Sequence, residues 1–118
     1  MEPDLKYLHS PDIDDLELFK PQDTERFAFL LQIMVGVRGE DGEESFDVQV
    51  CTLKWLEDKY AEDDVIIARH MLIVQKYNYQ GLLTTIHKFL QHCHGDTWRD
   101  VALKISRLGQ WEFEDYED

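Results

Sequence analysis

The sequence has only two cysteines and no long apolar run, and each shortage excludes a class of protein. No window approaches the roughly 20 apolar residues that a membrane-spanning helix needs. The N-terminus, Met1–Asp4, lacks the basic start of a secretory signal peptide. Because such a chain is expected to stay in the cytoplasm, Cys51 and Cys93 are predicted to be reduced thiols of the core rather than a disulfide.

The sequence also lacks the residue patterns of catalytic and metal sites. It has no Cys-x-x-Cys or His-Glu-x-x-His motif. Four metal-ligating residues lie near the end of one predicted helix, but they cannot converge, because neighbouring helical positions diverge by about 100°: His87, His92, Cys93 and His94. The many carboxylates lie in solvated runs, where no apolar surroundings raise their pKa. We therefore expect no catalytic residue, no metal site, no cofactor and no enzymatic activity.

Basic residues are scarce, since Lys and Arg number 12 against 25 Asp and Glu, and the formal net charge is −13. From Val65 to Trp111, six bases oppose two acids, whereas the rest of the chain carries 23 acids and six bases, a net charge of −17. Such a field repels nucleic acid and anionic membranes. It attracts a cationic partner, whose association it can accelerate roughly 10 to 1000-fold. The simpler alternative is that the acids only keep the protein soluble.

Apolar alternation between Phe27 and Leu56 predicts the centre of the fold, a β-hairpin that leads into a helix. Every second residue from Phe27 to Val37 is apolar, which places six apolar side chains on one face of a strand. Glycines and acids at 39–42 predict the turn, and the alternation resumes over Phe46–Val50. The opposite face of the first arm is small or apolar, so we expect this arm to lie centrally, with structure on both sides.

Weaker patterns predict the remaining elements. Residues 5–8 fit a short edge strand, and residues 10–21 fit a loop with a helical turn. After the hairpin we expect, in order, helix 53–60 capped by Thr52, an acidic loop, strand 67–77, helix 79–94 capped by Asn78 and helix 97–108, with Trp55 and Trp98 mostly buried. The chain of 118 residues is thus predicted to be one α+β domain, with a small antiparallel sheet of three to four strands and helices mainly on one face.

The acids gather in the N-terminal lead, around the hairpin tip, in the segment 57–64 and in the C-terminal tail. In the tail, Trp111 and Phe113 alternate with acids. One interpretation is that these aromatic residues anchor the tail while the acids face water. The other is that the acids form a surface for a basic partner, because interfaces combine aromatic anchors with complementary charge. The two interpretations are compatible.

An ordinary interface of roughly 800 Å² per side cannot contain all of these acids. We expect the tail and the 57–64 segment to meet at the end of the sheet opposite the hairpin tip, and we predict that they bind the partner together. The predicted partner-binding residues are Glu57, Asp58, Glu62, Asp63, Asp64, Glu112, Glu114, Asp115 and Tyr116.

Four stretches of the chain, in their order and spacing, resemble the immunity protein 8 family of bacterial polymorphic-toxin and contact-dependent inhibition systems: Val50–Leu56, Leu72–Val74, Gly95–Trp98 and Trp111–Tyr116. The resemblance extends from about Phe27 to Tyr116. It departs from the family pattern at Leu53, which stands where the family has proline. The resemblance implies a cytoplasmic protein, encoded beside a toxin, that binds the toxin domain and neutralises it. It supplies no contact residues.

We therefore expect a non-enzymatic inhibitor that is a monomer and binds one toxin domain in a 1:1 complex. We expect it to contact neither nucleic acid nor membrane. A nuclease is the expected class of toxin. Enzymes that grip polyanions are basic around their active sites, and an acidic protein can occupy that surface. The alternative is an acidic nucleic-acid mimic or adaptor that regulates a basic DNA-binding partner.

Overall fold

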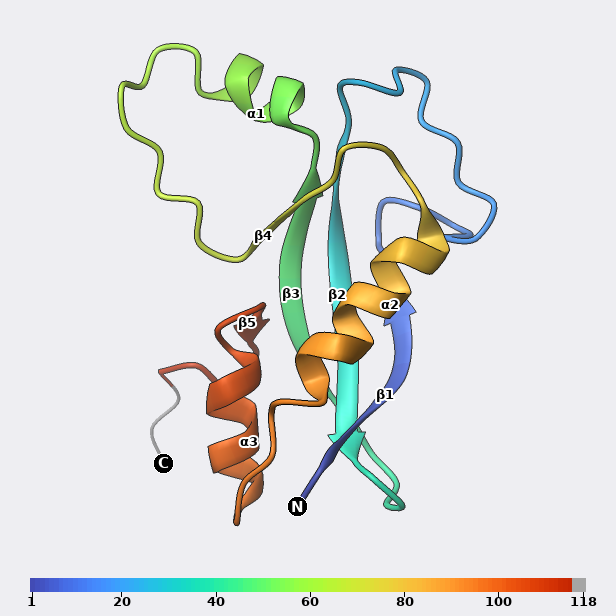
Figure 1. Cartoon of the computed structure of the whole chain (residues 1–118), viewed down its shortest axis with the longest axis vertical. Coiled ribbons are helices and arrows are strands. Elements are labelled where there is room, and N and C mark those ends of the chain that lie inside the picture. Colours follow the sequence, from blue (N-terminus) through green and yellow to red (C-terminus); the bar gives the residue numbers. More distant parts are fainter. Residues whose placement is uncertain (116–118) are drawn as a thin grey trace.

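The computed structural model describes residues 1–115, which form a mostly antiparallel sheet with helices packed against it (Figure 1). The predicted α+β class is confirmed. Within the described residues, no helix is long and apolar enough to cross a membrane. The elements follow in the order β1 (Pro3–His9), β2 (Ala28–Val37), β3 (Glu44–Cys51), α1 (Leu53–Lys59), β4 (Met71–Ile73), α2 (Tyr79–Leu90), α3 (Trp98–Ile105) and β5 (Gln110–Trp111).

The predicted hairpin, β2 and β3, is the centre of the sheet. Its antiparallel register runs from Ala28 opposite Cys51 to Val35 opposite Glu44. In the turn, Gly39 and Gly42 have φ angles of 83° and 95°, a left-handed conformation that side chains rarely adopt. β1 pairs antiparallel with the other edge of β2, as expected of an edge strand. β2 is therefore central in the sheet.

The outer edge of β3 is shared by two short strands. β4 runs parallel to Gln49–Cys51, and β5 runs antiparallel beside Phe46 and Asp47. The sequence did not predict the parallel pair. It arises because the chain leaves β3 through α1 and returns along a loop to the same edge, so that β4 enters in the direction of β3 (Figure 1).

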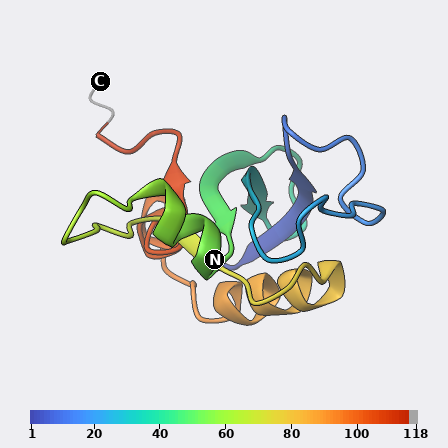
Figure 2. The same ribbon diagram turned by 90° about the horizontal axis from the view of Figure 1, so that it is seen from above.

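One face of the hairpin is the core. The alternating residues of β2 and β3 on this face are buried, and the inward residues of α2 and α3 belong to the same cluster. Figure 2 shows α2 lying against this side of the sheet. On the opposite face of β2, Leu30, Gln32 and Met34 remain half-buried, so the expected cover on both sides is only partly present.

Several predicted elements are shorter in the structure, among them the helix expected over residues 97–108, which is α3, and two of the others have a clear physical reason. The strand expected over residues 67–77 is limited to Met71–Ile73, because β5 occupies the β3 edge beside Phe46 and Asp47 and because β3 ends at Cys51, the partner of Ile73. α2 ends at Leu90, and the backbone N–H of Cys93 bonds to the Leu90 carbonyl in a tighter turn. The predicted N-caps Thr52 and Asn78 are confirmed.

Candidate partner-binding surface

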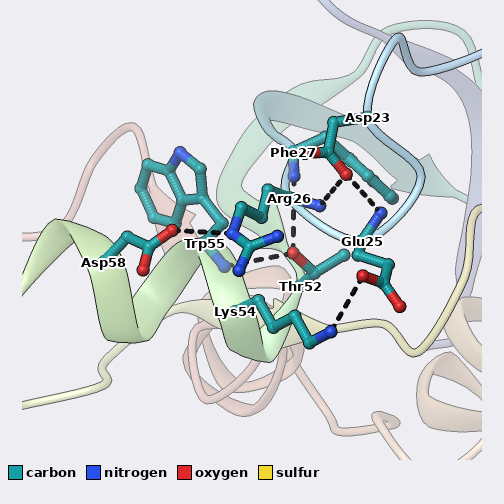
Figure 3. A network of polar contacts seen from close by, with 8 residues as sticks. All are labelled: Asp23, Glu25, Arg26, Phe27, Thr52, Lys54, Trp55 and Asp58. Atoms are coloured by element: carbon teal, nitrogen blue, oxygen red, sulfur yellow. Dashed lines mark hydrogen bonds and ion pairs between the residues drawn. The ribbon is translucent and has the colours of Figure 1, made fainter.

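The start of α1 is fixed to the start of β2 by one buried threonine. The hydroxyl of Thr52 accepts hydrogen bonds from the backbone N–H groups of Trp55, at 3.3 Å, and Phe27, at 3.4 Å (Figure 3). The backbone N–H of Thr52 donates to the Phe27 carbonyl at 3.1 Å. Because this cap satisfies donors from both elements, it sets the direction in which α1 leaves the sheet.

Ion pairs connect the outer side of α1 to the segment that precedes β2. Arg26 binds Asp58 at 2.9 Å and Lys54 binds Glu25 at 2.8 Å (Figure 3). The hydrogen bond from Lys54 lowers the pKa of the Glu25 carboxyl. One predicted partner-binding acid, Asp58, therefore already has a cation beside it, although its side chain remains exposed.

The remaining acids of α1 and of the loop that follows it are free. Their side chains are exposed and make no hydrogen bond or ion pair with any described residue: Glu57, Glu62, Asp63 and Asp64. Unpaired exposed carboxylates attract cations at a distance. The structure thus presents these four predicted residues in a form that is available to a basic partner.

The acidic loop continues into an exposed apolar run that sequence reasoning missed. Val65, Ile66 and Ile67, here called the aliphatic triad, have exposed fractions of 82%, 36% and 86%. β-Branched residues are typical of strands, which is why the sequence predicts that a strand begins at Ile67. One feature of the sequence could have indicated that this run is exposed. The three aliphatic residues directly follow an acidic run and lack the polar alternation of a surface strand.

The C-terminal tail is anchored by Trp111 of β5. The Trp111 ring is 6% exposed and stacks on Phe46 with centroids 6.4 Å apart. Its indole N–H donates to Glu44 at 3.0 Å, and the Trp98 indole donates to the same carboxylate at 2.8 Å. Gly109 lets the chain that leads into β5 pass close to β3, since a Cβ there would lie 3.1 Å from the carbonyl carbon of Phe46. The interpretation of Trp111 as an anchor is confirmed, and Trp98 packs against the core while half-buried.

The tail does not lie at the end of the sheet opposite the hairpin tip, so that expectation is wrong. The backbone N–H of Glu112 donates to the Ser45 carbonyl at 3.1 Å, and its carboxylate accepts from the Ser45 N–H at 2.8 Å. Ser45 is the second residue of β3, on the hairpin side. The backbone N–H and carbonyl of Ser45 thus hold the tail at this edge of β3. The sequence pattern does not show that these groups are open to the tail.

Two of the tail acids have structural partners. Glu112 is bonded to Ser45, and Glu114 forms an ion pair with Arg69, near the end of the α1–β4 loop. Asp115 is exposed, and Tyr116 lies outside the described residues. The Arg69–Glu114 pair joins the tail to the part of the α1–β4 loop nearest β4, which lies outside the predicted 57–64 segment. Reversing the charge of Glu112 or Glu114 would break native contacts and is a poor test of binding.

The two cysteines are packed thiols, as predicted. Cys51 and Cys93 are free and buried, and burial raises the pKa of both thiols. Within residues 1–115, no group of three His, Cys, Asp or Glu side chains could hold a metal ion. The exposed acids and the aliphatic triad of the α1–β4 region are surface features that suit recognition by a partner.

Comparison with known proteins identifies a family for this chain. A family model described as immunity protein 8 matches residues 3–116. No curated protein and no solved structure matches the chain.

Proposed function

Because this chain belongs to the immunity protein 8 family, we propose that it binds and neutralises a cognate toxin domain through an acidic surface formed by α1 and the α1–β4 loop. Membership makes it an immunity protein of toxin systems, with a toxin as partner. Beyond what membership shows, we propose that inhibition is non-enzymatic, that the complex is 1:1, and that the toxin is a nuclease.

The observation that carries the proposal is the set of unpaired acids at Glu57 and at 62–64. They are exposed and make no ion pair with the described residues, whereas Asp58 and Glu114 do have cationic partners. Free carboxylates on one projecting segment favour a partner with a basic surface. A nuclease has such a surface, because its substrate is a polyanion.

The distribution of charge favours one side of the molecule. The segment from Val65 to Trp111, which contains α2 and α3, holds six of the 12 bases and only two acids. The remaining segments carry a net charge of −17. The acidic segments therefore attract a basic partner more strongly than the segment that contains α2 and α3 does, which helps to orient the encounter.

We predict that association with the toxin slows by at least ~10-fold as salt rises from about 0.01 M, where the Debye length is about 30 Å, to about 1 M, where it is about 3 Å. Exposed acids act through long-range steering, which salt screens. The measurement is stopped-flow association with the catalytically silenced C-terminal domain of the protein encoded beside this chain. An association rate that does not change with salt would leave the acidic excess with no role beyond solubility.

A further inference from the structure

We propose that the aliphatic triad is the anchor of the toxin interface, and that it enters an apolar recess of the toxin domain surrounded by basic side chains. The inference rests on the proposed function and deepens it. It names the residues that hold the complex together and the chemistry of the surface that receives them.

The exposure of the triad is the primary observation. Val65 and Ile67 are 82% and 86% exposed, and Ile66 between them is 36% exposed. Single exposed aliphatic residues are common on protein surfaces, but contiguous exposed apolar runs mark interaction sites. The triad does not pair with β3, whose edge is already occupied by β4 and β5.

The loop that carries the triad is fixed at both ends. At its start, the backbone N–H of Asp63 donates to the Tyr60 carbonyl at 3.0 Å, which continues the end of α1. At its end, His70 bonds to the Ser106 carbonyl at 2.6 Å and Arg69 pairs with Glu114. An anchor held in place loses less conformational freedom when it binds.

The charges beside the triad define the rim of the partner's recess. Glu62, Asp63 and Asp64 precede it directly and are unpaired within the described residues. The nearest base on the other side, Arg69, is already paired with Glu114. The surface around the triad is therefore acidic, and the complementary surface is an apolar recess with lysine or arginine at its rim.

The test compares two kinds of exposed aliphatic residue. In one variant, Val65→Ser and Ile67→Ser are combined. In the control, Leu18→Ser replaces a residue that is 74% exposed in the β1–β2 loop. Most of this loop lies beside β1, at the opposite edge of the sheet from the α1–β4 loop (Figure 1). The dissociation constant is measured by calorimetry with the silenced C-terminal domain of the protein encoded beside this chain, and circular dichroism melting checks the fold of each variant.

We expect the triad variant to bind at least ~100-fold more weakly, because two aliphatic side chains are no longer buried at the interface. The Leu18→Ser control should bind like the wild type, and both variants should melt like it. Unchanged binding by the triad variant overturns the inference, as does equal weakening in the control. If the purified wild type is a dimer that the triad variant disrupts, the triad binds a second copy and the inference fails. If the wild type does not bind the toxin domain at all, the proposed function fails with it.

Discussion

Replacing Trp111 with alanine is expected to lower the free energy of unfolding by about 3 to 5 kcal/mol. The ring is 6% exposed and stacked on Phe46, so its removal leaves a cavity against the main core. The variant also removes an indole donor from Glu44, which lies 3.0 Å away. Equilibrium unfolding in urea, followed by circular dichroism, measures the change.

The matched control for this variant is Phe113→Ala. Phe113 is the next aromatic residue of the tail and lies edge-on to Trp111 at 5.9 Å, but it is 39% exposed. Its removal should therefore cost clearly less than the removal of Trp111. Should Trp111→Ala unfold at the wild-type urea concentration, β5 contributes little to the fold and the tail is not anchored as described.

Reversing the charge of Asp63 and Asp64 together, as Asp63→Lys with Asp64→Lys, is expected to abolish protection of cells that express the toxin. Lysines at these positions would face the basic rim of the toxin, and such a like-charge juxtaposition costs several kcal/mol. The fold should be unaffected, since both side chains are exposed and make no hydrogen bond or ion pair with the described residues. Growth of cells that express toxin and variant together measures protection, and thermal melting checks the fold.

The control Asp14→Lys with Glu17→Lys changes the net charge of the protein by the same amount. Both residues are exposed, and they precede Glu25 and Arg26, the part of the β1–β2 loop that pairs with α1. This variant should protect like the wild type. Equal loss of protection in both variants would show that only the total charge matters, and full protection by the Asp63 and Asp64 variant would exclude these acids from the interface.

Local patterns in the sequence predict the hairpin, the three helices and two of their caps. The alternation from Phe27 to Val37 and the glycines of the turn lie within short windows, so neighbouring residues contain the information. Thr52 and Asn78 act on backbone donors three residues further on. Such contacts depend on local spacing, which a sequence displays directly.

The positions of β4, β5 and the tail could not be predicted in the same way. They depend on which part of the β3 edge is open, and that follows from contacts between residues far apart in the chain. The bond from Ser45 N–H to Glu112 joins positions 67 residues apart. Strand propensity alone therefore predicts that β4 begins at Ile67. In the structure, β4 begins at Met71 and Ile67 is exposed.

For the candidate surface, sequence reasoning found the acids but not their partners. Glu57 and the acids of 62–64 are exposed, as solvated runs predict. The pairing of Asp58 with Arg26 and of Glu114 with Arg69 joins separate segments and was not predictable. Because Asp58 and Glu114 already have cationic partners, we infer that the unpaired acids of the 57–64 segment contribute more to the proposed surface than the tail does.

The most direct test of the central claim is a titration of toxin activity. Increasing amounts of this protein are added to a fixed concentration of the active cognate toxin domain, well above the dissociation constant, and the remaining activity is measured. A stoichiometric, non-enzymatic inhibitor should reduce activity linearly to a sharp end point at one molecule of inhibitor per toxin domain. Activity that persists beyond the end point, or that disappears progressively with time at a small fraction of one equivalent, would contradict inhibition by 1:1 binding.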